Sequence, residues 1–405
     1  MDTPISVEIT TTGWAVGGAA VGRDDSGRAV FAAGALAGER VRVAITREQA
    51  RFANGEVEQV LTPSADRVEP SCPEVANGCG GCDFAHVSAT AQREAKQQMV
   101  TDALTRIGRV EAPQIASGPM LADRRFRSTV RAFPVPGSAE GRVGLLRRAS
   151  HDTVAVASCE VAHPLVQELL VEGRYPGATE VMIRVGIRTG ERLVVVTPTV
   201  GSASVPDGVI LVGADELDAG RRAWIHEEVA GHTFRVSARS FFQTRPEGAD
   251  ALVELVRAGA GPAGQQLGRV VDLCAGVGVF AATMPARSVV AVEPNASAIA
   301  DARINLRAHS DARIVRANLA RWHPEPADVV IADPPRAGLG KDGVRVVAAT
   351  GAARVVLISC DAGSLGRDAG LLTGAGFALD RVELVDMFPQ TSHVEVVSTF
   401  TRRSL

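Results

Sequence analysis

The sequence is poor in cysteine and contains no long apolar run. Its 405 residues include only six cysteines, too few for the disulfide framework of a secreted scaffold. No apolar stretch approaches the roughly 20 residues that a membrane-spanning helix needs. The N-terminal residues lack the charged region and apolar core of a signal peptide. These absences argue against disulfide-rich secreted and helical membrane proteins, and they predict a soluble protein of the reducing cytoplasm.

The chain also lacks an excess of either charge. Its net charge is −3, so any nucleic-acid binding must come from local patches rather than from a basic protein as a whole. A hydrophobic content of 46% over this length allows a large core and predicts two or three domains. There are no internal repeats and no low-complexity tract.

Residues 1–62 alternate apolar and polar positions with frequent glycine, which predicts a small β-barrel. A barrel of the oligonucleotide-binding (OB) kind is the alternative to one with a merely solvated face. Charge alone does not separate a solvated face from an RNA-binding one. The arginines near its later strands are Arg40, Arg42, Arg47 and Arg51.

Residues 63–245 are expected to form a β-rich central domain, with a helix over 86–110 and strands in VMIRVGI and RLVVVTP. A basic run in this region could form either a solvated face or a surface that follows an RNA backbone. The run comprises Arg124, Arg125, Arg127, Arg131, Arg147 and Arg148.

From residue 246 to 405 apolar strands alternate with helices, which predicts a doubly wound, Rossmann-like α/β domain. Two buried parallel strands are expected over 329–332 and 355–358, joined by a helix over 342–350. Asp333 follows the end of the first strand, and Cys360 follows the end of the second. Because ligands bind beyond the carboxyl ends of such strands, this carboxylate and this thiol are expected to meet over one crevice.

A glycine turn follows the expected strand 269–273. Asp272 precedes it, and it contains Gly276 and Gly278. Glu293 comes about 20 residues later, at the end of the next strand, where an acidic residue holds ribose hydroxyls. The third glycine of a dinucleotide motif is missing. Together with Asp333-Pro-Pro, the pattern favours S-adenosylmethionine over a nicotinamide cofactor.

The residue after Asp333-Pro-Pro is Arg336, where amino-methyltransferases of adenine and cytosine carry an aromatic residue. This difference argues against base-amino methylation. Cys360 could simply be a small apolar residue that ends a strand. As a thiolate it could instead add to C6 of a uracil and make C5 nucleophilic, provided that a base later removes the C5 proton. His393 and Glu395 are the candidate bases in the tail.

Four motifs, taken in order, resemble those of the RNA uracil-5-methyltransferases, and the resemblance covers nearly the whole chain. They are SFFQT at 240–244, DPPRAGL at 333–339, SC at 359–360 and DMFPQTSHVE at 386–395. The resemblance implies a class I S-adenosylmethionine-dependent methyltransferase domain, with Cys360 as nucleophile and Glu395 as base. It further implies that Gln243, Glu293, Asn318 and Asp333 line the pocket of cofactor and base.

The chain departs from this family at two places. Cys274 and Val279 stand in the glycine turn where the family has an aromatic residue and an asparagine, so one polar cofactor contact is expected to be lost. Asp361 follows the candidate nucleophile where the family has asparagine. An adjacent carboxylate raises a thiol pKa, so this side chain is expected to point elsewhere.

Three cysteines cluster at Cys72, Cys79 and Cys82, and Cys159 is the candidate for a fourth ligand. From spacing alone, zinc held by the three clustered cysteines and His86 is an equal alternative to an iron–sulfur cluster. The resemblance implies a [4Fe–4S] cluster.

The barrel resembles the TRAM domain found in part of the family. Barrel and cysteines together resemble the 23S rRNA enzymes, with a tRNA enzyme as the alternative. A monomer that binds RNA is expected. An RNA-binding protein with a degenerate methyltransferase domain is the remaining possibility.

Overall fold

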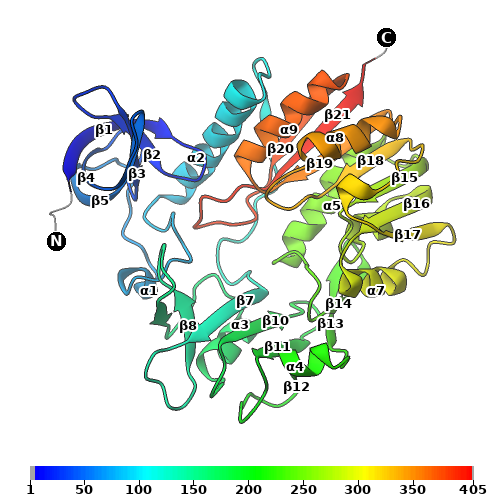
Figure 1. Cartoon of the computed structure of the whole chain (residues 1–405), viewed down its shortest axis with the longest axis horizontal. Coiled ribbons are helices and arrows are strands. Elements are labelled where there is room, and N and C mark those ends of the chain that lie inside the picture. The colour runs from blue at the N-terminus through cyan, green and yellow to red at the C-terminus, as the bar shows by residue number, and fades with distance from the viewer. Residues whose placement is uncertain (1–4, 404–405) are drawn as a thin grey trace.

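The computed structural model describes residues 5–403, which form three β-centred parts (Figure 1). The first is a closed barrel in which the strands follow the order β1-β2-β3-β5-β4. Alternate side chains such as Ile9, Val30 and Val41 fill its interior, as a half-buried strand pattern requires. The predicted small barrel is therefore confirmed. Its strands are β1 (Ser6–Trp14), β2 (Ala20–Arg23), β3 (Ala29–Ala33), β4 (Arg40–Glu48) and β5 (Phe52–Thr62).

A short helix α1 (Pro73–Ala76) and a long helix α2 (Ala89–Asp102) follow the barrel. The hydroxyl of Ser88 accepts a hydrogen bond from the Ala91 N–H and caps α2. The helix continues as a π-helical turn, Ala103–Ile107. The helix expected over 86–110 is thus present, although its capping serine makes it begin later.

The central part is a six-stranded sheet in the order β12-β11-β10-β7-β8-β9. Helix α3 (Pro164–Val171) packs on it, and Val166, Leu169 and Leu170 are buried there. A short helix α4 (Ala214–Asp218) and the hairpin β13–β14 lead on to the C-terminal part. The strands are β7 (Thr129–Pro134), β8 (Val143–Leu146), β9 (Thr153–Ala155), β10 (Glu180–Val185), β11 (Arg192–Thr197), β12 (Val209–Gly213), β13 (Trp224–Val229) and β14 (His232–Ser237).

The C-terminal part is an eight-stranded sheet in the order β17-β16-β15-β18-β19-β21-β20-β6. Strands β15 to β19 are parallel, and β21 runs antiparallel between β19 and β20. The strands are β15 (Leu267–Leu273), β16 (Ala286–Glu293), β17 (Ala312–Arg316), β18 (Val329–Ala332), β19 (Arg354–Ser359), β20 (Phe377–Leu384) and β21 (Val396–Arg402).

Helices cover both faces of this sheet. Val271 of β15 and Val330 of β18 belong to the apolar cluster on one face, whereas Val270 and Ile331 belong to the cluster on the other. Strands buried on both faces are what a doubly wound α/β domain requires, so the predicted fold class is confirmed. The helices are α5 (Pro246–Ala260), α6 (Val279–Thr283), α7 (Ala296–Asn305), α8 (Gly340–Ala349) and α9 (Ala362–Gly374), with a 3-10 turn η2 at Leu319–Arg321.

One strand of this sheet comes from far outside residues 246–405. Strand β6 (Ile115–Ser117) pairs in parallel with β20, and Ile115 lies opposite Val382. The sequence analysis assigned this stretch to the central domain. A three-residue strand has no detectable hydrophobic period, so its pairing could not be predicted.

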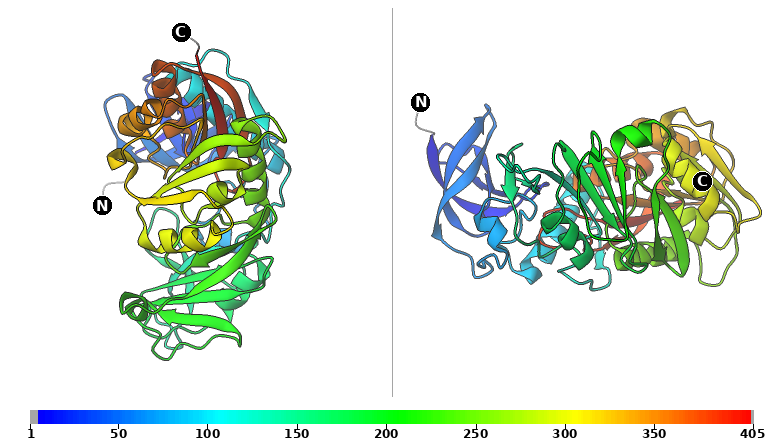
Figure 2. Two further views of the ribbon diagram at one scale, coloured as in Figure 1. Left: turned by 90° about the vertical axis from the view of Figure 1, so that its right-hand side faces the viewer. Right: turned by 90° about the horizontal axis from the view of Figure 1, so that it is seen from below.

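Helix α2 joins the barrel to the C-terminal part. One apolar cluster contains Val41 of the barrel, Met99 of α2 and Leu365 of α9. Figure 2 shows the barrel at one end of the molecule and the C-terminal sheet at the other. Within residues 5–403 we find no helix that is both long and apolar enough to span a membrane.

Candidate active site

The candidate active site lies at the carboxyl ends of the parallel strands. Strand β15 ends at Leu273, β18 ends immediately before Asp333, and β19 ends immediately before Cys360. Because β15, β18 and β19 are neighbours in the sheet, their following residues share one edge. The structure thus brings Cys274, Asp333 and Cys360 to the same end of the domain, as predicted for Asp333 and Cys360.

The glycine turn after β15 has left-handed backbone at Cys274 (φ 62°), Gly276 (φ 55°) and Gly278 (φ 88°). The Glu293 carboxylate accepts hydrogen bonds from the N–H groups of Gly276 (2.9 Å) and Asn295 (2.8 Å), which ties the end of β16 to this turn. A Cβ at Gly276 would meet nothing within 4 Å. The turn therefore exposes its backbone to open space beside a carboxylate, which fits a bound nucleoside.

Asp272 lies inside the domain, below the turn. One carboxyl oxygen accepts a hydrogen bond from the Ala281 N–H at 2.9 Å, and the other, buried oxygen has no partner within the described part of the chain. Burial, followed by the charges of Asp333 and Glu293, raises the pKa of Asp272 to about 8. This shift favours the uncharged acid, and the hydrogen bond from the Ala281 N–H holds α6 against the turn.

Gln243 connects the SFFQT motif to Asp333. Its Nε2 donates a hydrogen bond to Asp333 Oδ2 at 3.4 Å, and the backbone N–H of Asp333 donates to the Leu273 carbonyl at 3.2 Å. Burial raises the pKa of Asp333 to about 7. Gln243 and Asp333 thus share one side of the crevice.

The SFFQT motif is anchored by Asp301 of α7, a residue that the sequence analysis did not single out. The fully buried Asp301 carboxylate accepts hydrogen bonds from Ser240 Oγ (2.6 Å), Ser237 Oγ (2.7 Å) and Ser237 N–H (2.8 Å). It also pairs with Arg235 Nε at 2.7 Å. The only signal in the sequence is an acidic residue among the alanines of this helix, which is too weak to predict such an anchor.

The Cys360 thiol is affected electrostatically by Glu395. Burial, followed by the charges of Glu395 and Asp333, raises the pKa of the Cys360 thiol to about 11, and Arg336 opposes this rise. Burial and the charge of Asp333 raise the pKa of Glu395 well above its usual range. These shifts favour the protonated thiol of Cys360 and the uncharged forms of the neighbouring carboxyls.

Arg336 and His393 meet at the rim, with Arg336 Nη2 3.3 Å from His393 Nε2. The ring of Phe388 packs edge-on against the His393 ring, with centroids 6.0 Å apart. Asp361 turns away from Cys360, because its carboxylate accepts a hydrogen bond from the Ser364 N–H at 2.7 Å and caps α9. This outcome agrees with the expectation that its side chain points elsewhere.

Within residues 5–403, three residues singled out in the sequence make no side-chain hydrogen bond to the rest of the site. Asn318 is exposed at the start of η2, and in residues 5–403 its side chain makes no hydrogen bond to another site residue. Val279 is buried as the first residue of α6 and offers no polar atom. Cys274 is half-buried in the turn, and burial raises the pKa of its thiol to about 12.

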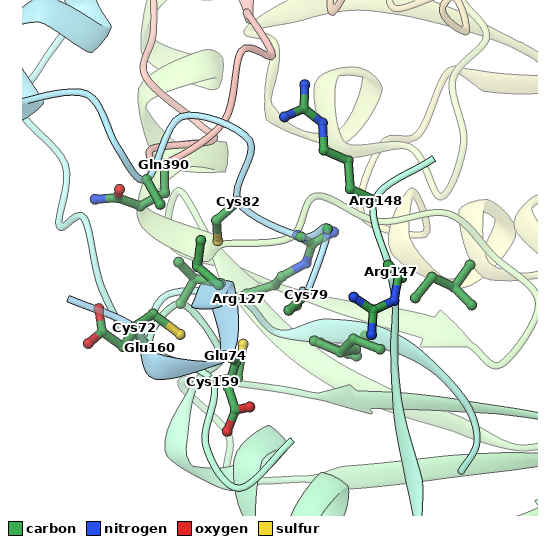
Figure 3. Close-up of a pocket in the computed structure, with 18 of the residues that line it drawn as sticks. Cys72, Glu74, Cys79, Cys82, Arg127, Arg147, Arg148, Cys159, Glu160 and Gln390 are labelled. Atoms are coloured by element: carbon green, nitrogen blue, oxygen red, sulfur yellow. The ribbon is translucent and has the colours of Figure 1, made fainter. Parts of the chain in front are cut away.

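Cys72, Cys79, Cys82 and Cys159 line a single cavity of about 720 Å³, which we call the cysteine cavity (Figure 3). Burial, followed by the other three cysteines, raises the pKa of Cys82 to about 12. His86 does not line this cavity. Throughout residues 5–403, no three His, Cys, Asp or Glu side chains converge closely enough to hold one metal ion.

A doubly wound sheet with a glycine turn, an acidic residue at the end of the next strand and an Asp-Pro-Pro sequence at its carboxyl edge defines a class I S-adenosylmethionine-dependent methyltransferase. Family models agree: that of the TRAM domain matches residues 5–57, and that of the methyltransferase small domain matches residues 246–355.

Relatives cover nearly the whole chain. An uncharacterized RNA methyltransferase of Streptomyces coelicolor is 32% identical over 94% of this chain and 90% of its own length. Another, from Thermosynechococcus vestitus, is 31% identical over 92% of this chain and 93% of its own. The chain belongs to this family of RNA methyltransferases, and its combination of domains fits the RNA uracil-5-methyltransferases expected from the motifs.

A solved structure agrees with this fold. The tRNA (uracil-54, C5)-methyltransferase of Pyrococcus abyssi, in complex with S-adenosyl-L-homocysteine, superposes with a TM-score of 0.70. The match covers 98% of this chain and 99% of that one at 20% identity. This likeness establishes the shared fold.

Proposed function

We propose that this RNA methyltransferase forms 5-methyluridine, with 23S rRNA as its substrate, by covalent catalysis through Cys360. The observation that carries the proposal is the meeting of a thiol, Cys360, with a buried carboxyl, Glu395, at the edge where the glycine turn lies. A thiol is both a good nucleophile and a good leaving group. A desolvated carboxyl is a stronger base once it is ionised.

The residues divide the reaction between them. The target base must leave its stack, because C6 is inaccessible there. The Cys360 thiol first loses its proton to solvent, and its sulfur then bonds to C6 while the C5–C6 π electrons move onto the uracil O4 as an enolate. S-adenosylmethionine, when bound, would supply the methyl group that C5 takes. Glu395, in its ionised form, then removes the C5 proton, the double bond re-forms, and the sulfur leaves as a thiolate. Gln243 and Asp333 line the same crevice and are suited to hold the uracil edge.

Residues of this chain fit the cofactor. We assign Glu293 to the ribose hydroxyls, because its two oxygens keep a second lone pair each after binding the N–H groups of Gly276 and Asn295. Gly276 would let the cofactor approach the backbone, whereas Gly278 packs against Leu306, whose Cδ1 would lie 2.6 Å from a Cβ there. We keep Asn318 at this pocket from the motif alone, and we assign Asp272 an internal supporting role.

We further infer that Cys72, Cys79, Cys82 and Cys159 hold a [4Fe–4S] cluster. Four thiols around one cavity match the usual ligand set, and Arg127 opposes the rise in pKa at Cys82 and Cys159, so it favours thiolates there. Such a cluster is larger than a single ion. Its expected role is to tie the barrel to the central sheet. Iron, sulfide and zinc analysis of anaerobically purified protein tests this, and stoichiometric zinc without iron would overturn it.

The decisive experiment supplies labelled S-adenosylmethionine and, separately, unmodified 23S rRNA and tRNA, followed by nucleoside mass spectrometry. We expect 5-methyluridine in 23S rRNA, none with Cys360→Ala, and a persistent protein–RNA adduct with Glu395→Gln. Cys274→Ala is the matched control, because this second thiol lies at the same edge without a proposed chemical role.

Each other outcome contradicts a defined part of the proposal. A product only in tRNA would reassign the substrate, an alternative that the Pyrococcus abyssi likeness supports. Methylation on nitrogen that is indifferent to Cys360 would favour base-amino methylation. No product and no measurable cofactor binding by calorimetry would favour an RNA-binding protein with a degenerate domain.

A further inference from the structure

We propose that Arg147 and Arg148 bind the phosphodiester backbone of the substrate RNA at the mouth of the cysteine cavity, and that the cysteine loop, Gly78–Cys82, sets their position. The inference rests on RNA being the substrate, as proposed above. It adds an RNA-binding surface on the central sheet, between the barrel and the crevice, and gives the cysteine loop a direct part in RNA binding.

The first observation is unbalanced positive charge. Four arginines line the cysteine cavity: Arg127, Arg131, Arg147 and Arg148. The charge of Arg131 is already engaged, because its guanidinium pairs with both carboxylate oxygens of Glu180 at 2.7 and 2.5 Å. Within residues 5–403, the exposed guanidinium groups of Arg147 and Arg148 have no hydrogen-bond or ion-pair partner.

The carboxylates of the same cavity do not neutralise this pair. Glu74 is buried and accepts hydrogen bonds from Asn77 Nδ2 (3.0 Å) and from the Ala157 N–H (2.7 Å). Glu160 accepts from Ser71 Oγ at 2.8 Å and lies 3.8 Å from Arg124. Both oxygens of Glu74 are thus engaged, Glu160 lies beside Arg124, and within residues 5–403 neither carboxylate pairs with Arg147 or Arg148. Two free guanidinium groups in succession suit the closely spaced phosphates of a nucleic acid.

The second observation is the direct packing of the cysteine loop against the arginines. Cys79 forms an isolated antiparallel bridge with Arg147, and the Gly80 N–H donates a hydrogen bond to the Leu146 carbonyl at 3.0 Å. A Cβ at Gly80 would lie 2.6 Å from the backbone of Arg148. The loop and the end of β8 thus form one small ladder, and a shift of the loop must move the two arginines.

The third observation is location. Arg148 reaches toward the barrel, where a Cβ at Gly34 would lie 3.9 Å from its Nη1. Gln390, from the 386–395 loop that ends at Glu395, lines the same cavity. The close-up in Figure 3 shows Arg147, Arg148 and Gln390 around the cysteines. An RNA strand held here lies between the barrel and the loop that carries the proposed base.

The experiment measures the affinity of the full-length protein for a short fluorescently labelled RNA hairpin as a function of salt. Each bound phosphate contributes a slope of about 0.7 to 0.9 in log K against log salt. We expect Arg147→Ala and Arg148→Ala each to reduce the magnitude of this negative slope by about 0.7 to 0.9. Arg147→Lys and Arg148→Lys, which keep the positive charge, should leave the slope unchanged. The control Arg345→Ala removes the same charge from the exposed surface of α8 and should leave the slope unchanged.

Two glycine substitutions in the cysteine loop, one as the test and one as its control, examine the role of the loop. Gly80→Ala places a Cβ against the backbone of Arg148, whereas a Cβ at the neighbouring Gly81 would meet only Cys79 Sγ at 3.7 Å, an ordinary contact. We expect Gly80→Ala to lower the salt slope and Gly81→Ala to preserve it, with thermal unfolding and iron content measured on both.

An unchanged slope in both arginine-to-alanine variants would overturn the phosphate contact. Equal slopes for the two glycine variants would overturn the role of the loop. If the arginine variants lose slope while the wild type makes no 5-methyluridine, the proposed reaction fails and the RNA-binding surface stands. If 5-methyluridine forms and the slopes do not change, the surface alone fails.

Discussion

At the residue scale, the central feature is the protonated thiol of Cys360. Burial and the carboxyls of Glu395 and Asp333 raise its pKa to about 11, whereas a reactive thiol has a lowered pKa. The shift therefore favours the unreactive thiol form of Cys360. Because Arg336 is the cation that opposes these effects, we expect the balance of charge at the rim to decide how readily the thiolate forms.

This balance predicts the reactivity of Cys360 toward iodoacetamide. With a pKa near 11, the thiolate fraction rises about tenfold per pH unit between pH 7 and 10, and the alkylation rate should rise with it. Arg336→Gln should lower the rate at each pH, because it removes the opposing cation. Peptide-resolved mass spectrometry provides the measurement. A rate already flat above pH 7 would mean that the thiolate exists in the resting enzyme.

At the element scale, α7 positions the SFFQT motif through one buried carboxylate. Asp301 accepts four hydrogen bonds from residues 235–240. Asp301→Asn would replace one acceptor by a donor and leave buried donors unsatisfied, at a cost of roughly 2–4 kcal/mol in the free energy of unfolding.

Urea denaturation measures this cost. The matched control is Asp342→Asn, which breaks an exposed pair with Arg345 on α8 and should cost less than about 0.5 kcal/mol. Equal effects of the two substitutions would contradict the anchoring role. Because Gln243 follows the anchored stretch, Asp301→Asn should also raise KM.

Local signals in the sequence were sufficient for the elements that carry the site. The helix predicted over 342–350 is α8, Gly340–Ala349, and the buried strands deliver Asp333 and Cys360 as expected. These predictions succeeded because each element has its own hydrophobic period and its own turn residues. The roles of the individual site residues remain predictions.

What the sequence did not reveal are contacts between distant segments. The anchor at Asp301, the ladder between Cys79 and Arg147, and the pairing of β6 all join residues with no shared local pattern. The packing of a second segment decides each of them. The basic run in the sequence includes Arg147 and Arg148, but only the three-dimensional structure shows that the cysteine loop packs against them.

At the scale of the whole molecule, the barrel touches the 386–395 loop directly. Gly18 has left-handed backbone (φ 85°), and a Cβ there would lie 2.3 Å from Ser392 Cβ. The neighbouring Gly17 is also left-handed (φ 93°), but a Cβ there would meet nothing within 4 Å. Both glycines are left-handed and the Gly17 carbonyl also accepts a hydrogen bond from Ser392 Oγ at 3.4 Å, but only a Cβ at Gly18 would clash with the loop.

We expect Gly17→Ala to cost about 1 kcal/mol, the strain of a left-handed residue. Gly18→Ala should cost more and should also slow methylation, because it pushes on the loop that ends at Glu395. Thermal unfolding and the methylation rate give the two readouts. If the two variants behave alike in both, the barrel does not position the loop.

Strand β6 has a consequence for the order of folding. The ribosome makes Ile115 long before its partner Val382, so the edge of the largest sheet stays open until almost all of the chain has been synthesised. An open edge invites pairing with other chains. A fragment that starts at residue 246 would keep β20 uncovered permanently, and it should therefore aggregate where the full-length protein does not.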